Sequence, residues 1–115
     1  EAEKLKAAKA GDYVLFGTYE QDNNNANGEE NIEWLVLEVK EGKVLLISKN
    51  ALDCRSYNTL WAKTTWSTCA IRKWLNDAFL NTAFNLAERA IIANTIVRAD
   101  KNPAYKTKPG HATMD

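Results

Sequence analysis

The chain has 115 residues, of which 45% are hydrophobic and 26% are charged, and its 15 Lys and Arg balance its 15 Asp and Glu. This length suits one small globular domain, and the hydrophobic content excludes disorder as the main state. The zero net charge excludes the basic surface that non-specific binding to nucleic acid or an anionic membrane requires, and no apolar stretch approaches the roughly 18 residues of a membrane span.

The first ten residues combine Lys, Glu and Ala, which favour a helix, with little apolar surface to bury. We therefore expect residues 1–10 to be a lead-in helix or linker and residues 11–115 to form the domain. Because the chain opens at Glu1 rather than at Met, we also expect a processed or trimmed N-terminus that an export signal could have preceded. The domain begins with a short strand, Tyr13–Phe16, which Gly17 closes.

A polar loop follows over residues 22–30, in which Asn27-Gly28 is typical of a tight turn with positive φ. The pattern Asn-x-Asn-x-Asn-Gly over residues 23–28 is similar to the start of a calcium loop, because it offers oxygen ligands at alternate positions. The twelfth place of such a loop falls on Trp34 rather than on an acidic residue. We therefore expect no metal here, and no cofactor motif occurs elsewhere.

Two strands are predicted next, Ile32–Val39 and Lys43–Ser48, joined by the three residues Lys40-Glu41-Gly42. Side chains in both strands alternate between two faces, and both faces are apolar. A hairpin of this kind needs cover on both sides, so we expect it at the centre of a layered domain.

A helix capped by Thr68 is predicted from an apolar stripe at helical spacing, whose members are Ile71, Trp74, Leu75, Ala78 and Phe79. The polar residues Arg72, Lys73, Asn76 and Asp77 are expected to turn outward. We expect Trp74, Leu75 and Phe79 to be buried against the central hairpin.

A second helix is predicted after the capping box formed by Asn85 and Glu88, with Leu86, Ala90 and Ile91 on its buried side. Residues 95–98 suit one more short strand. The chain after Asp100 contains two Pro and few apolar residues, so we expect an extended tail with no closing element. A C-terminal fragment or a second copy of the chain would then complete the core over the hairpin's second face.

The sequence contains few residues that could act as a nucleophile or bind a metal ion. Cys54 and Cys69 are the only cysteines, too few for a structural zinc site, and they are either a disulfide or two buried thiols. His111 is the only histidine and lies in the Pro/Gly tail, where it lacks the rigid placement that a catalytic arrangement needs. We therefore expect no catalytic residue.

Three aromatic residues, Tyr57, Trp61 and Trp66, lie among hydroxyl and amide side chains. This mixture stacks on and hydrogen-bonds a sugar or a peptide, so these residues are the candidate ligand-binding site. Core packing is the stronger interpretation of these residues, because Trp is on average largely buried.

Several stretches resemble the bacterial domain of unknown function 6273 family across Gly11 to Asp115. They are Gly11–Gly17, Ile32–Leu37, Leu46–Lys49, Ala51–Cys54, Tyr57-Asn58, Thr65–Cys69 and Ile71–Asn76. The resemblance implies a secreted or surface protein of anaerobic, often gut, bacteria, with a C-type-lectin-like fold shared with formylglycine-generating sulfatase modifiers. The family's second half, with its Trp-Trp-Leu-Arg-Ser-Pro-Gly stretch, does not occur in this sequence, so the chain is expected to be the N-terminal portion of such a domain.

The sequence thus predicts an α+β domain with a small antiparallel sheet and two helices. The leading function is a non-catalytic extracellular or cell-surface recognition module whose ligand is a carbohydrate or a protein. The alternatives are a sulfatase-modifier-like enzyme whose active site lies in a missing C-terminal half, and a structural module that only packs against neighbouring domains.

Overall fold

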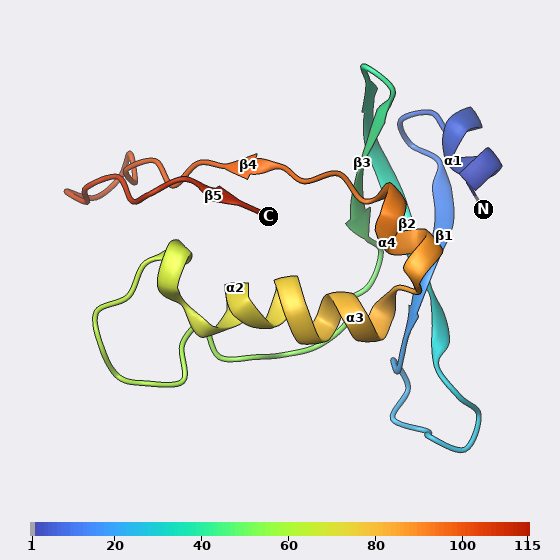
Figure 1. Ribbon diagram of the computed structural model, residues 1–115, viewed down its shortest axis with the longest axis horizontal. Coiled ribbons are helices and arrows are strands. Elements are labelled where there is room, and N and C mark those ends of the chain that lie inside the picture. Colours follow the sequence, from blue (N-terminus) through green and yellow to red (C-terminus); the bar gives the residue numbers. More distant parts are fainter. Residues whose placement is uncertain (1) are drawn as a thin grey trace. The chain divides into compact units, whose positions relative to one another are not determined.

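The computed structural model describes residues 2–115 and has an α+β fold with a small antiparallel sheet, which confirms the predicted class (Figure 1). Its elements divide between two compact units, the part up to Cys54 with Thr82–Ile91, and Arg55–Asn81 with Ile92–Asp115. In chain order the elements are α1 (Ala2–Ala7), β1 (Tyr13–Tyr19), β2 (Glu30–Lys40), β3 (Lys43–Ser48), the 3-10 helix η1 (Trp66–Thr68), α2 (Ala70–Trp74), the π-helical turn η2 (Leu75–Phe79), α3 (Leu80–Ala83), α4 (Leu86–Ile91), β4 (Ile96–Val97) and β5 (Thr113–Met114).

The sheet of the first unit has the order β1-β2-β3, with both pairs antiparallel. The predicted hairpin forms between β2 and β3, but its turn is shorter than expected, because β2 continues through Lys40 and β3 starts at Lys43. The two turn residues, Glu41 and Gly42, have φ of 52° and 72°. Two positive φ values are what the tightest hairpin turn requires, which explains the glycine.

Strand β1 does not close at Gly17, as the sequence predicted, but runs on to Tyr19 through an irregularity in its pairing between Leu15 and Thr18. Gly17 lies in this irregularity with φ of 76°. A Cβ atom there would lie 2.6 Å from the Phe84 ring and 2.8 Å from the carbonyl oxygen of Ala83. Only glycine admits both this backbone conformation and this close approach.

One face of the sheet is the core of the first unit. Ile32 and Val36 are fully buried on it, and the Phe16 ring meets the edge of the Phe84 ring with centroids 5.1 Å apart. The indole nitrogen of Trp34 donates to the Phe16 carbonyl oxygen over 2.6 Å, so the polar end of a large aromatic residue is satisfied inside this layer.

Helix α1 covers the other end of this same face. Ala8, just after the helix, is buried against Val14 and Val36, and Leu5 packs beside them. The composition of residues 1–10 indicated little to bury, yet a single leucine and alanine are enough to attach this segment to the core.

Within the described part of the first unit, the opposite face of the sheet is left open, and the sequence likewise predicted that this chain would leave one apolar face of the hairpin without cover. Tyr13, Leu15, Leu45 and Ile47 lie on this open face around the half-buried Leu35, and each of these four is between 45% and 56% exposed. They share a face because Tyr13 pairs with Leu35, which in turn pairs with Ile47. Within the first unit, α1 and the residues around Phe84 both pack on the buried face, so none of the described elements of this unit lies over the open one.

The first predicted helix is present as the continuous run α2, η2 and α3. It starts at Ala70 with Cys69 as its N-cap residue, so the predicted cap at Thr68 is wrong. Trp74, Leu75 and Phe79 are half-buried rather than buried. The centroid of the Trp74 ring lies 5.1 Å from that of the Phe79 ring. The Arg55 guanidinium lies over the Trp74 ring, 4.4 Å from its centroid. The predicted stripe is kept in part, because Ile71 is half-buried like Trp74, Leu75 and Phe79, whereas Ala78, in the π-helical turn, is exposed.

The predicted capping box of α4 is confirmed. Asn85 N donates to Glu88 over 2.9 Å, and Glu88 N donates to the Asn85 side chain over 2.8 Å. The second carboxylate oxygen of Glu88 accepts from Gly17 N over 2.9 Å. Because this bond draws the Glu88 side of α4 toward the sheet, Leu86, Ala90 and Ile91 are exposed, and their predicted burial is wrong.

The C-terminal segment does have a closing element, contrary to expectation. β4, within the predicted strand over residues 95–98, pairs with β5, and Thr95 and Asp115 exchange backbone hydrogen bonds of 2.6 and 2.8 Å. Gly110 N also donates to Ala99 O over 2.7 Å, so the tail returns along β4. His111 is exposed, as predicted.

Among residues 2–115, no helix combines the length and the apolar character needed to cross a membrane.

Replacing Gly17 with Ala should destabilise the first unit severely. The left-handed φ costs about 1–2 kcal/mol, and the overlap with Phe84 and the Ala83 carbonyl adds roughly 1–3 kcal/mol. Urea unfolding gives the total. Gly42→Ala is the matched control, because Gly42 also has positive φ but a Cβ there meets nothing within 4 Å. Equal losses for the two variants would show that the close approach carries no cost.

Candidate functional site

The loop of residues 55–65 is attached at its start to the N-terminus of α2. Ala70 N donates to the Asn58 side-chain oxygen and Ile71 N to the Tyr57 carbonyl oxygen, both over 3.1 Å. These two amides lack partners within the helix, so the loop supplies the caps that Cys69 does not. The Asn58 amide group also donates to Leu60 O over 3.0 Å, which fixes the next part of the loop.

The end of the loop is fixed by threonine and serine hydroxyls around η1. Thr65 N donates to Thr68 Oγ1 over 3.3 Å, and the same hydroxyl lies 3.0 Å from that of Thr64. Thr65 Oγ1 lies 3.0 Å from Ser67 Oγ. The segment between Asn58 and Thr64 is therefore held at both ends by hydrogen bonds within the second unit.

The three predicted aromatic site residues have different environments. Trp61 is fully exposed, and its neighbour Leu60 is 73% exposed. Tyr57 is half-exposed, whereas Trp66 is half-buried. The loop thus exposes Trp61 and Tyr57 to solvent, whereas Trp66 packs within the second unit.

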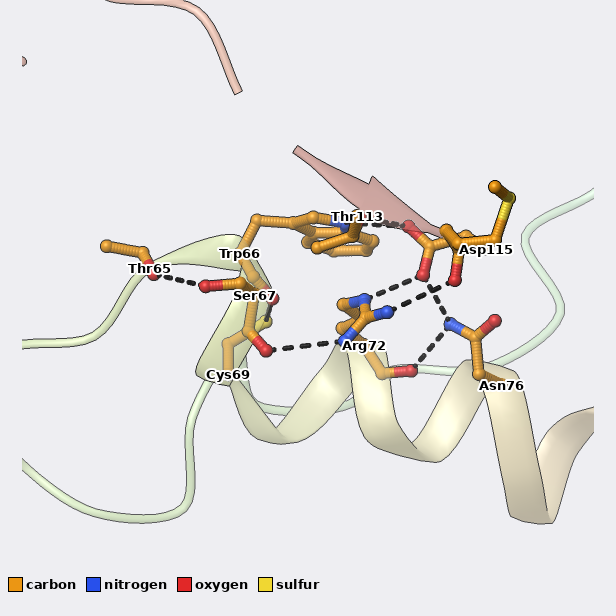
Figure 2. Close-up of polar contacts among 9 residues, drawn as sticks. Thr65, Trp66, Ser67, Cys69, Arg72, Asn76, Thr113 and Asp115 are labelled. Atoms are coloured by element: carbon orange, nitrogen blue, oxygen red, sulfur yellow. Dashed lines mark hydrogen bonds and ion pairs between the residues drawn. The ribbon is translucent and has the colours of Figure 1, made fainter. Parts of the chain in front are cut away.

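Trp66 belongs to a hydrogen-bonded network centred on the carboxylate of Asp115 (Figure 2). One oxygen accepts from the Trp66 indole nitrogen over 3.0 Å and from the Thr113 hydroxyl over 2.6 Å. The other accepts from Arg72 Nε over 2.6 Å and from the Asn76 amide over 3.1 Å. The Arg72 guanidinium also donates to the carbonyl oxygens of Ser67 and Met114, so it joins η1, α2 and β5.

The network keeps Asp115 ionised. Burial on its own would raise the pKa of Asp115, but the hydrogen bonds from Thr113, Trp66 and Arg72, with the positive charge of Arg72, lower it below its usual value of 3.8. All four donors point at a carboxylate whose two oxygens are each doubly engaged. The arrangement suits an anchor for the chain rather than a reactive acid or base.

The two cysteines are not bonded to each other in this structure and have opposite environments. Cys69 is 2% exposed and its thiol donates to Trp66 O over 3.2 Å, whereas Cys54 is exposed. Desolvation raises the pKa of the Tyr57 hydroxyl, and the neighbouring Cys69 adds to this effect. The pairing of Cys54 with Cys69 stays a prediction.

Carboxylates gather in the first unit, where Glu20, Asp22 and Glu30 bring one oxygen each within 4.8 Å of one another. Desolvation, a hydrogen bond with Asp22 and the charge of Glu30 raise the pKa of Glu20, whereas the Asn27 side chain leads the contacts that lower the pKa of Asp22. These residues are not those of the predicted calcium-like pattern. Exposed acidic groups of this kind are common without an ion.

The Asp115 network was missed in the sequence, and part of the prediction there is wrong. Arg72 was expected to turn outward, but its side chain is only 25% exposed because it lies on the Asp115 carboxylate. Thr113 is buried although it falls in the predicted extended tail. The available signal was the four-residue spacing of Arg72 and Asn76, which places their polar groups on one side of the helix.

Comparisons with known proteins agree with the resemblance over the second part of the chain. Residues 41–115 match the family model described as "Domain of unknown function (DUF6273)". No match was found among curated proteins or among solved structures.

Replacing Asp115 with Asn should destabilise the protein by about 1–3 kcal/mol near neutral pH, since charge-assisted hydrogen bonds are lost. Because the pKa of Asp115 is lowered in the folded protein, its contribution is complete above the usual value of 3.8 and is lost as the pH falls through the lower folded value. Urea unfolding of both proteins across this pH range should show the difference shrinking in acid.

The matched control is Asp100→Asn, which removes the ion pair between Asp100 and Arg98. The side chain of Arg98 is 76% exposed and that of Asp100 is 65% exposed. This change should leave stability almost unaltered at every pH. A wild-type advantage over Asp115→Asn that persists in strong acid would refute the anchoring role of the carboxylate.

Proposed function

Since the chain belongs to the DUF6273 family of domains of unknown function, we propose that it is a non-catalytic recognition module that binds carbohydrate through the loop of residues 57–61. The module is bacterial and works outside the cell or on its surface, as the resemblance implies. Its fold is the N-terminal portion of a C-type-lectin-like domain. The α+β class and the small antiparallel sheet are compatible with this assignment.

The observation that carries the proposal is the exposure of Trp61. A fully solvated indole next to a 73% exposed leucine leaves apolar surface in contact with water, which is unfavourable unless another molecule covers it. A flat aromatic ring that is free on its surface stacks well on the apolar face of a sugar ring. Tyr57 adds a second partly exposed ring, with its hydroxyl as a polar handle.

The attachment of the loop supports a binding role. Asn58 uses its side-chain oxygen on Ala70 N and its amide group on Leu60 O, so its hydrogen bonds order the loop before any ligand arrives. Ordering in advance reduces the entropy lost on binding. Trp66 contributes to affinity only indirectly, because its indole nitrogen is committed to Asp115 and Thr113.

The open face of the sheet supports a second proposal, that another copy of the chain covers it. Its side chains Tyr13, Leu15, Leu45 and Ile47 are about half exposed, so covering each one would contribute about 0.7–1.5 kcal/mol, half of the gain for full burial. The chain's net charge is zero, so copies do not repel one another at long range. A C-terminal fragment held as a separate chain is the competing partner.

Replacing Trp61 with Ala should abolish binding to the glycan that the chain selects on an array, while unfolding stability changes by less than about 0.5 kcal/mol because the side chain is fully exposed. Tyr105→Ala is the matched control, since Tyr105 is a 73% exposed aromatic residue outside the loop. A chain that binds neither glycans nor peptides on arrays would contradict the recognition role and favour a structural packing module.

Replacing Ile47 with Lys should shift the chain toward monomers in size-exclusion chromatography with light scattering, because a charge would be buried at the interface. Leu86→Lys is the control, as Leu86 is 79% exposed on α4 and lies outside the open face. A wild-type chain that is monomeric at all concentrations would contradict self-association.

A further inference from the structure

The loop between β1 and β2 carries the Asn27-Gly28 motif in a fully solvated setting. Every residue from Asp22 to Glu29 is exposed. Gly28 has φ of 80°, and a Cβ atom at this position would have nothing within 4 Å, so no neighbouring group crowds its α-carbon. Within the part of the chain that the structure describes, Gly28 N donates no hydrogen bond.

We propose that Asn27 is a site of spontaneous deamidation, in which the backbone nitrogen of Gly28 attacks the side-chain amide carbon of Asn27. Hydroxide removes the proton from Gly28 N, a bond forms from this nitrogen to Asn27 Cγ, and the bond from Cγ to Nδ2 breaks. Nδ2 takes up a proton and leaves as ammonia. Water then opens the cyclic imide at either carbonyl to give aspartate or isoaspartate, so water is the only co-reactant.

The structure makes this site more reactive than Asn23 and Asn25 in the same exposed loop. For Asn23 the attacking nitrogen is that of Asn24, which donates to Glu20 over 3.1 Å and to Asp22 over 2.8 Å. For Asn25 it is that of Ala26, which donates to Asn24 Oδ1 over 3.2 Å. A nitrogen whose proton is held by an acceptor loses that proton less readily, and only Gly28 combines a free amide with the absence of a side chain.

The product would alter the loop through charge. The Asn27 amide donates to Asp22 Oδ2 over 2.8 Å. Conversion replaces this donor by a carboxylate facing the Asp22 carboxylate, beside Glu20 and Glu30, so an attraction becomes a repulsion among four acidic groups. The net charge of the chain falls from zero to one negative charge.

The test incubates the purified full chain at mildly alkaline pH, follows its charge by ion exchange and locates the change by peptide mass spectrometry with isoaspartate detection. We expect conversion at Asn27 to be at least roughly tenfold faster than at Asn23 or Asn25, the ratio that a barrier difference of about 1.4 kcal/mol gives. The rate should fall in mild acid, because the attacking nitrogen must lose its proton. Asn27→Gln should remove the acidic species while leaving the other asparagines unchanged.

The same measurement on the urea-unfolded chain separates structure from sequence. Unfolding frees the amides of Asn24 and Ala26, so the preference for Asn27 should narrow relative to the folded chain. Equal rates at Asn27 and Asn25 in the folded chain, or conversion at Asn27 without any isoaspartate, would overturn the proposal.

Discussion

The second unit depends on one carboxylate. Asp115 accepts hydrogen bonds from the 3-10 helix, from α2 and from β5, and Arg72 reinforces the same three segments through the carbonyl oxygens of Ser67 and Met114. None of these segments has a buried apolar stripe of its own, since η1 and α2 contain no buried residue. Because so little apolar surface is buried here, polar contacts must hold these segments together. Such contacts stabilise the unit most strongly when the carboxylate is ionised and every donor has an acceptor.

Three of the stretches that carry the family resemblance, all in the second unit, serve this anchor or the loop of residues 55–65. Tyr57-Asn58 caps α2, Thr65–Cys69 forms the 3-10 turn that supplies Trp66, and Ile71–Asn76 provides Arg72 and Asn76. Much of the motif is therefore explained by holding backbone segments together. Trp61 lies outside these stretches, at the part of the loop that these hydrogen bonds leave free, so a change at this position can be accommodated without loss of the fold.

The sheet and the capping box were predictable because their signals are local. Alternating apolar residues fix β2 and β3, turn residues fix the connection, and Asn85 and Glu88 are three positions apart. The errors arise from contacts distant in sequence. Glu88 reaches Gly17 over 71 positions and turns Leu86 outward, while Asp115 reaches Arg72 over 43 positions and turns it inward. The candidate site residues were recognisable by their residue type. Only the structure shows that Trp61 is exposed to solvent whereas Trp66 is hydrogen-bonded to Asp115.

The strand order β1-β2-β3 has a consequence for solubility. The outer strands of a three-stranded open sheet have one edge whose backbone groups the sheet does not pair, and β3 has the apolar, β-branched composition that recruits further strands into fibrils. Lys43 begins β3, and Lys49 follows it directly, bound to Glu33 over 3.2 Å and placed 5.1 Å from the Tyr13 ring. Charges at both ends of a short edge strand penalise stacking of like strands in register. These lysines therefore act as gatekeepers that let an apolar strand edge remain in water without nucleating aggregation.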